Sequence, residues 1–384
     1  MTRAAAAVAL WVLALVVLSG CGGPAPKPAR AAAARNFAPR RRPKGSPPAP
    51  FVDPHNIYAA DQAGDLSPVV RRFPERVYVP NSASNTVDEI DPRTYRVVRQ
   101  FGVGTLPQHV VPSYDLRTLW VTNDLGNSLT PIDPATGAPG QPVSVEDPYN
   151  MYFTPDGRYA VVMAERLQRV DFRDADTMAL HHSLSVPECP GVNHAAYTAD
   201  GRLMLVSCEF GSAMIVIDVA REQVVRTIRL RAGAKPQDVS LSPDGRVFYV
   251  ADLALGGVWE IAASRFRVTG FLRTGAGAHG LYPSRDARFL YVSNRAAGTV
   301  SVIRFATKRK VATWTIPGGS PDMGGVSASG AVLWLSGRYD AAVYALDTRT
   351  GRLIRRIPVG VGPHGLCVYP QPGRFSLGHT GVMR

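Results

Sequence analysis

The sequence predicts an all-β fold, a seven-bladed β-propeller whose ring is closed by a C-terminal strand joining blade 1. Two observations support this prediction. A short motif recurs seven times at a spacing that fits one four-stranded blade, and the apolar runs alternate with period two, as in Thr299-Val300-Ser301-Val302-Ile303. Repeats of helices would instead show a period of about 3.6 residues.

The repeat consists of a Thr/Ser-Pro-Asp-Gly-like turn followed by a strand with an apolar pair. The clearest turns begin at Thr154, Thr198 and Ser242, and the apolar pairs end at residues 79, 121, 162, 206, 250, 292 and 335. Consecutive pairs are therefore 41 to 44 residues apart. A segment of about 42 residues holds four short strands and four turns, which is one propeller blade.

Four strands are expected in each repeat. Strand A precedes the turn, strand B contains the apolar pair, strand C ends in an Ile-Asp-like pair such as Ile90-Asp91, and strand D follows. The first repeat lacks a strand A, whereas the chain end supplies a spare strand over residues 362–369. We therefore expect this spare strand to become the inner strand of blade 1, which also removes an exposed sheet edge.

The N-terminus predicts export and a lipid anchor. Residues 1–20 are expected to be a signal peptide, because Arg3 precedes a 15-residue apolar run that is too short for a comfortable membrane span. The tetrad Leu18-Ser19-Gly20-Cys21 resembles a bacterial lipobox, in which the cysteine takes a diacylglycerol. This resemblance implies a lipidated Cys21 on the outer face of the cell membrane, in the cell envelope. A cleavable signal with a chance cysteine is the alternative.

Residues 21–72 are expected to be the lipidated cysteine and a disordered tether, and residues 73–384 the propeller with a short C-terminal tail. Residues 22–50 hold eight prolines, seven basic residues and no acidic residue, so they cannot bury enough apolar surface to order themselves. Without these seven and Arg3, the net charge falls from +13 to +5. Contact with anionic lipid headgroups and a plain soluble stalk both account for the tether. No basic stripe runs through the propeller, so we expect no nucleic-acid partner.

Several B strands carry a recognisable motif. Tyr78-Val79-Pro80-Asn81, Trp120-Val121-Thr122-Asn123 and Tyr291-Val292-Ser293-Asn294 resemble the Tyr-Val-Thr-Asn motif of YVTN-repeat propellers, the YncE-like group. The resemblance covers about residues 76–370, and the copies at 161–164 and 205–208 depart from it. It implies a surface or periplasmic propeller, and most members of the group lack an assigned reaction.

The starts of the A strands are expected to line the central channel and to bind its ligand. One register is polar in all seven blades: Gln108, Tyr149, Asn193, Gln237, His279, Asp322 and His364. His279, Asp322 and His364 fall on consecutive blades, where two imidazoles and a carboxylate could bind a divalent metal. A hydrated polar channel mouth is the other interpretation. His109 and His194 lie one position later, so strand alternation is expected to turn them away from the ring.

The cysteines other than Cys21 also carry predictions. Cys189 and Cys208 are expected on the entry to strand A and on strand B of blade 4, close enough for a disulfide in an oxidising compartment, although two free thiols remain the alternative. Cys367 lies on the predicted inner strand of blade 1, so we expect a buried free thiol.

The functional prediction rests on the polar ring and on missing signatures. The sequence has no nucleophile elbow, zinc-protease helix, Walker loop or haem attachment site. We therefore expect a binding or scaffold module without a required cofactor, which engages an unknown protein, glycan or small ligand at the channel face. The alternative is a metal-dependent or lactonase-like enzyme using His279, Asp322 and His364, and a third reading is a structural component of the cell envelope.

Overall fold

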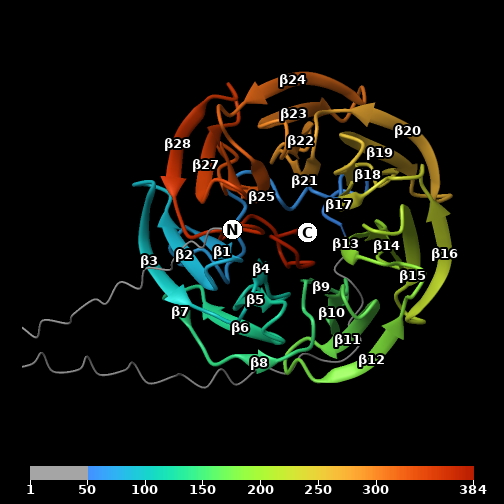
Figure 1. Ribbon diagram of the computed structural model, residues 1–384, viewed down its shortest axis with the longest axis horizontal. Helices are drawn as coiled ribbons and strands as arrows, with labels where there is room; N and C mark the ends of the chain where they lie inside the picture. The colour runs from blue at the N-terminus through green and yellow to red at the C-terminus, as the bar shows by residue number, and fades with distance from the viewer. Residues whose placement is uncertain (1–50) are drawn as a thin grey trace, which may run out of the picture. The chain divides into compact units, whose positions relative to one another are not determined.

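The computed structural model describes residues 51–384, in which twenty-nine strands and no helix are found. The strands form seven antiparallel sheets around a central channel (Figure 1), which confirms the predicted seven-bladed propeller. The predicted signal peptide, Cys21 and the part of the predicted tether up to residue 50 lie outside the described residues. Within the described part, no helix is long and apolar enough to span a membrane.

The first four blades follow the predicted repeats. Blade 1 comprises β29 (Cys367–Tyr369), β1 (Arg76–Asn81), β2 (Thr86–Asp91) and β3 (Arg96–Gly102). Blade 2 comprises β4 (Pro107–Pro112), β5 (Leu119–Asn123), β6 (Ser128–Asp133), β7 (Ala138–Pro139) and β8 (Val143–Ser144). Blade 3 comprises β9 (Asn150–Phe153), β10 (Tyr159–Ala164), β11 (Arg169–Asp174) and β12 (Leu180–Ser185). Blade 4 comprises β13 (Val192–Tyr197), β14 (Leu203–Cys208), β15 (Ala213–Asp218) and β16 (Gln223–Arg229).

The remaining three blades complete the ring. Blade 5 comprises β17 (Pro236–Leu241), β18 (Val247–Asp252), β19 (Gly257–Ala262) and β20 (Arg267–Arg273). Blade 6 comprises β21 (Ala278–Pro283), β22 (Phe289–Asn294), β23 (Thr299–Arg304) and β24 (Arg309–Thr315). Blade 7 comprises β25 (Pro321–Val326), β26 (Val332–Gly337), β27 (Ala342–Asp347) and β28 (Leu353–Pro358).

The ring closes as predicted. Strand β29 pairs antiparallel with β1, with Val77 opposite Val368 and Tyr78 opposite Cys367. Blade 1 is therefore built from both ends of the propeller sequence, and its inner edge is covered. Cys367 is a buried free thiol, as expected.

The outer strand of blade 2 differs from the others because it is divided into β7 and β8. Both pieces pair with β6, and the interruption contains Pro142 after Pro139 ends β7. Proline has no backbone N–H to donate, so a proline pair breaks the ladder of a strand.

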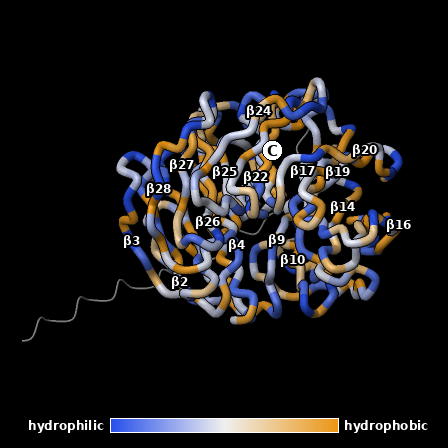
Figure 2. The backbone as a smooth tube through the Cα atoms, turned by 45° about the horizontal axis from the view of Figure 1, so that its top comes forward, coloured by the Kyte–Doolittle hydropathy of each residue, from blue (hydrophilic) through white to orange (hydrophobic). Residues whose placement is uncertain are grey.

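The apolar side chains of strands A to C fill the spaces between neighbouring blades. The largest fully buried side chains include Trp334, Tyr78, Tyr152 and Phe248, all on inner or second strands. Strand D is half-exposed in most blades, and Figure 2 shows hydrophobic stretches within the strands and hydrophilic ones mainly in the outer turns. This core fixes the A strands, so their starts hold a rigid ring of side chains around the channel.

The N-terminal boundary of the propeller differs from the expectation, because residues 51–72 are not a disordered tether. The Tyr58 hydroxyl donates to the carbonyl of Leu241, and Leu66 forms a bridge with Gly373. Ile57, Tyr58 and Val70 are buried in the core. The burial of these three apolar side chains offsets the entropy cost of ordering this segment.

The C-terminal residues 371–384, which we call the strap, do not hang free as a tail but turn back into the centre of the ring (Figure 1). The Phe153 amide donates to Leu377, and the His379 amide donates to Met151. Cys189 and Cys208 form a disulfide in blade 4, with Cα atoms 4.7 Å apart.

Candidate metal centre

Histidines gather at the centre of the propeller. Five of the chain's eight histidines lie there, and each is buried: His109, His194, His279, His364 and His379. They come from blades 2, 4, 6 and 1 and from the strap, so segments far apart in sequence meet at one place. Buried ionisable groups are costly, and a cluster of them marks a candidate site.

The predicted group of His279, Asp322 and His364 does come together. The Nδ1 atom of His279 lies 3.1 Å from Oδ1 of Asp322, and Nε2 of His364 lies 3.5 Å from Oδ2 of Asp322. One candidate ligand atom on each of the three residues lies within 4.8 Å of the others. Met323 joins this group, because its sulfur is 2.8 Å from the His279 Nδ1 atom.

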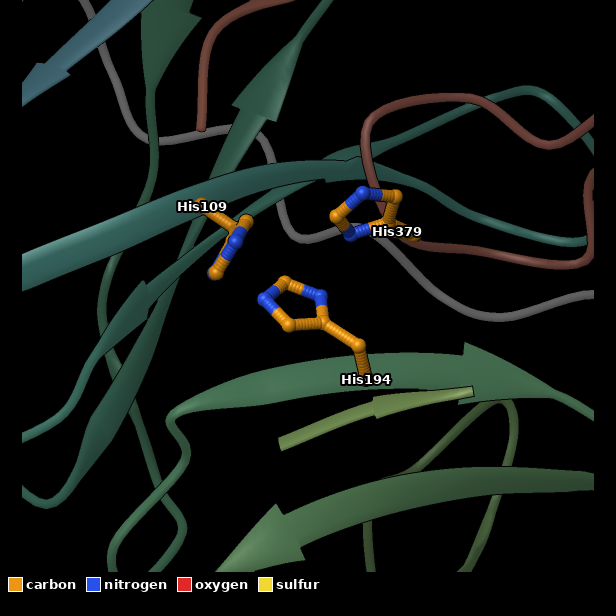
Figure 3. Close-up of side chains that lie close together, drawn as sticks. All are labelled: His109, His194 and His379. Atoms are coloured by element: carbon orange, nitrogen blue, oxygen red, sulfur yellow. The ribbon is translucent and has the colours of Figure 1, made fainter. Parts of the chain in front are cut away.

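A second group consists of His109, His194 and His379, whose side chains lie close together (Figure 3). The ring centroids of His109 and His194 are 5.6 Å apart, and His379 lies 5.2 Å from His109 and 5.1 Å from His194. The two groups touch, since the His109 and His364 centroids are 4.9 Å apart.

The expectation that His109 and His194 turn away from the channel ring was wrong. Strict alternation fails because the pairing of strands A and B is irregular at these positions, between Pro107 and Val110 and between Val192 and Ala195. An irregular register re-aims side chains locally. Both imidazoles therefore point into the channel beside the predicted group.

Burial holds these imidazoles neutral. Loss of solvent is the main cause that lowers the pKa of His109, His194, His279 and His364 well below the usual value. For His279 the nearby Arg295 guanidinium adds to this, and for His364 the Arg338 guanidinium does so. Neutral imidazole is the form that ligates a metal ion.

Several ring and carboxylate atoms in the two groups have no hydrogen-bond partner although they are buried: Nε2 of His109, His194 and His379, Nδ1 of His364 and Oδ2 of Asp322. Buried polar atoms in native proteins are nearly always satisfied, so each orphan requires an explanation such as a bound ion. Here five orphans belong to two neighbouring groups, and the His379 Nε2 atom lies 3.6 Å from Oδ1 of Asp238.

The other members of the predicted polar ring do not ligate this centre. Asn193 donates to Glu209, and Gln108 lies 3.4 Å from the hydroxyl of Ser82. Gln237 is buried, and its side chain contacts Glu209. Tyr149 stays at the centre, where its ring lies 5.4 Å from that of His109. The polar ring therefore divides into a central group and a group at the channel mouth.

The channel mouth carries charges of both signs. Burial together with the Glu209 charge raises the pKa of Glu165 to about 8. Arg295 lies 3.1 Å from Oδ1 of Asp322, with Tyr339 stacked against its guanidinium. Arg338 donates to Ser82. Arg295 thus links the central carboxylate to the mouth.

Sequence reasoning missed His379 and the supporting Asn150. The strap has no counterpart in the repeat, so no register placed His379 in the channel. A signal was present, since a glycine adjoins each of these histidines: Gly378 precedes His379, and His279 and His364 are each followed by glycine. Glycine next to such a histidine permits close backbone approach.

A protein-family model covers most of the chain. The model described as "YNCE-like beta-propeller" matches residues 58–372. The chain belongs to this family. A search of curated proteins found no match for this YncE-like propeller.

Solved structures share its fold. The periplasmic gluconolactonase PpgL of Pseudomonas aeruginosa is 20% identical with a TM-score of 0.65, over 78% of this chain and 99% of that chain. A functionally unknown protein from Desulfotomaculum acetoxidans DSM 771 is 16% identical with a TM-score of 0.64, over 76% and 98%. Hydrazine synthase of Kuenenia stuttgartiensis is 22% identical with a TM-score of 0.58, over 67% and 87%. At these identities the likeness concerns the fold alone.

Proposed function

We propose that this YncE-like propeller is an exported binding protein that holds a late first-row transition-metal ion in its channel, through His279, Asp322 and His364. The observation that carries this proposal is the convergence of two neutral imidazoles and a carboxylate, each nearly fully buried, from three consecutive blades. Such a group is expensive to bury unless something satisfies it. A single bound metal ion would satisfy the polar atoms of all three residues.

The chemistry of the donors selects the class of ion. Imidazole nitrogen suits zinc, copper, nickel and iron, whereas calcium and magnesium prefer sets of oxygen ligands. The thioether of Met323 next to His279 adds a soft donor, which favours copper among these ions. Metal–nitrogen bonds of about 2.0–2.1 Å place the donors of a tetrahedral site about 3.3 Å apart. The distances of 3.1 and 3.5 Å from the Asp322 oxygens to His279 Nδ1 and His364 Nε2 are close to that spacing.

Elemental analysis tests the proposal. The full-length protein is purified, stripped with a chelator, reloaded with Zn²⁺ or Cu²⁺ and washed, and its metal content is compared with that of a His279→Ala/His364→Ala double variant. We expect bound metal in the wild type and the loss of one ion in the double variant. A wild type that holds no metal after washing, with no rise in melting temperature when metal is added, contradicts the proposal.

The location is proposed from the N-terminal sequence. A lipid on Cys21 would hold the propeller at the outer face of the cell membrane, and the tether would let it move near that surface. The Cys189–Cys208 disulfide supports an oxidising compartment outside the cytoplasm. Mass spectrometry of the N-terminal peptide from the native host tests this. We expect a mature N-terminus at Cys21 that carries a diacylglycerol. A mature protein that begins at another residue and carries no lipid contradicts this location.

A second candidate function is a lactonase-like activity at the same centre. Arg295 favours it, because this cation extends from Asp322 towards the mouth and could receive an anionic sugar-acid product. Hydrolysis of gluconolactone and 6-phosphogluconolactone by the metal-loaded protein is the test. Turnover that disappears in His364→Ala supports this candidate, and no turnover above the buffer rate leaves the binding role alone.

A further inference from the structure

The strap places a histidine against the channel wall with little freedom. Gly378 forms a bridge with Tyr152, and the His379 amide donates to Met151 in β9. A Cβ atom on Gly378 would lie 2.5 Å from the Tyr152 Cα atom, so only glycine permits this approach. The backbone of His379 has a φ of 51°, a left-handed conformation that residues other than glycine rarely adopt. Backbone strain of this kind often occurs at functional sites.

The ring nitrogens of the second group are arranged for ligation. Nδ1 of His109 lies 2.9 Å from the carbonyl oxygen of Tyr149. A carbonyl can only accept, so Nδ1 carries the proton and Nε2 presents its lone pair to the channel. Hydrogen bonding of one imidazole nitrogen to fix the other as a ligand is the usual support of a metal-bound histidine.

Asn150 supports the two other histidines. Its side-chain nitrogen Nδ2 lies 3.2 Å from Nδ1 of His194 and 3.0 Å from Nδ1 of His379, and its oxygen accepts from the Met151 amide. A half-turn of the amide, which breaks the bond from Met151, would let the oxygen accept from both Nδ1–H groups and leave both Nε2 atoms as acceptors, that of His379 beside Oδ1 of Asp238 at 3.6 Å. The nitrogen and oxygen of a side-chain amide exchange by a rotation about one bond.

We propose that His109, His194 and His379 form a second transition-metal position, next to the first, and that a zinc- or copper-class ion there fastens the strap to the ring. This inference rests on the proposed function, because the second ion would lie beside the first. The three residues form the second candidate ligand set, with one ligand atom of each within 4.8 Å of the others. Their Nε2 atoms are buried without a hydrogen bond, and that of His379 lies 3.6 Å from the Asp238 carboxylate. Ring contact between His109 and His364 makes the pair of positions a dinuclear centre, in which ions typically lie about 3.5–4 Å apart.

Metal stoichiometry under native mass spectrometry tests this second position. Full-length protein is loaded with Zn²⁺, and Co²⁺ is used in parallel because its visible spectrum reports ligand geometry. We expect two ions in the wild type and one in His379→Phe. Phenylalanine keeps a ring that can stack on Tyr152, 5.9 Å away, but has no ligand atom. Gly378→Ala provides a second route, since it displaces the strap without removing any histidine.

Two controls make the outcome specific. His181 and His182 lie half-exposed beside Glu222 on the outer strand of blade 3, where metal could bind adventitiously. The His181→Ala/His182→Ala variant is expected to keep two ions. The His279→Ala/His364→Ala variant is expected to keep one ion, held by the second position.

The two proposals fail in different ways. A wild type with one ion, which His379→Phe retains and His279→Ala/His364→Ala loses, overturns the second position and leaves the proposed function standing. Two bound ions in the His379→Phe variant also overturn the second position. One ion in the wild type that His379→Phe loses and His279→Ala/His364→Ala retains overturns the first position only. Limited proteolysis adds a readout, because metal should protect the strap from cleavage in the wild type and leave it sensitive in His379→Phe.

Discussion

The imidazole of His109 lies directly against Gly365, where a Cβ atom would come within 2.1 Å of the His109 Cδ2 atom. The two residues also form a parallel bridge between blades 2 and 1. This contact explains why a glycine follows His364: it leaves room for a histidine from the next blade, so that imidazoles from two blades can lie side by side.

Replacing this glycine tests the contact. Gly365→Ala is expected to push the His109 ring out of place, to weaken metal binding at the second position about 10-fold and to cost about 1–3 kcal/mol of unfolding free energy through overpacking. Zinc titration and urea unfolding measure the two effects. Gly102→Ala, at a site with no atom within 4 Å of the added carbon and no left-handed backbone, is a control for substitution of a glycine with no packed neighbour. Unchanged zinc affinity in Gly365→Ala contradicts the prediction.

Two substitutions of Asn150 are expected to change the zinc affinity in opposite directions. Asn150→Asp places a carboxylate where it accepts from Nδ1–H of both His194 and His379, so zinc should bind about 10-fold more tightly. Asn150→Leu removes the acceptor and should weaken zinc binding by about 10- to 100-fold. Competition against a chelator of known affinity measures both. Equal affinities in the two variants would show that Asn150 does not orient these rings.

The sequence predicted the fold well because the information is local and repeated. Turns such as Thr154-Pro155-Asp156-Gly157 and pairs such as Ile90-Asp91 fall where the structure has the A–B turn of blade 3 and the end of β2. Seven such copies fixed the blade number, and a missing first strand identified the closing segment at residues 362–369. Each of these signals is a property of neighbours in sequence.

The candidate site could be predicted only in part. His279, Asp322 and His364 were found because they occupy one register of the repeat. His109 and His194 were misplaced, since a register irregularity in strands β4 and β13 leaves no trace in the residue pattern. His379 depends on how the strap folds back, which is a long-range contact outside the repeat.

The disulfide should stabilise the fold without shaping the centre. It closes a loop between residues 19 positions apart, so Cys189→Ser/Cys208→Ser is expected to lower the free energy of unfolding by about 3 kcal/mol. The zinc content should not change, because both cysteines lie outside the two ligand groups. Urea unfolding with and without reductant measures the effect, and wild-type stability in the variant contradicts it.

Glu165 should make stability depend on pH. Burial, with the charges of Glu209, Asp124 and Asp147, raises its pKa to about 8, while a hydrogen bond from Asn193 lowers it. The folded state therefore holds a proton that the unfolded state has released, and stability falls as pH rises from about 4.5 to 8. Glu165→Gln should remove this loss and stabilise the protein by about 1–3 kcal/mol at pH 9.

Urea unfolding of both proteins at pH 5 and pH 9 gives the comparison for Glu165. The difference between wild type and Glu165→Gln should be small at pH 5, where the folded wild type is protonated, and large at pH 9. Glu188→Gln, the same change at a partly exposed glutamate, is the control. Equal differences at the two pH values would count against a raised pKa at Glu165.

Anomalous X-ray scattering from crystals of the metal-loaded protein tests the central claim most directly, because it locates each ion. Data collected above and below the absorption edge of zinc or copper should give two peaks in the channel, one among His279, Asp322 and His364 and one among His109, His194 and His379. Occupied surface sites with no peak in the channel would contradict the account.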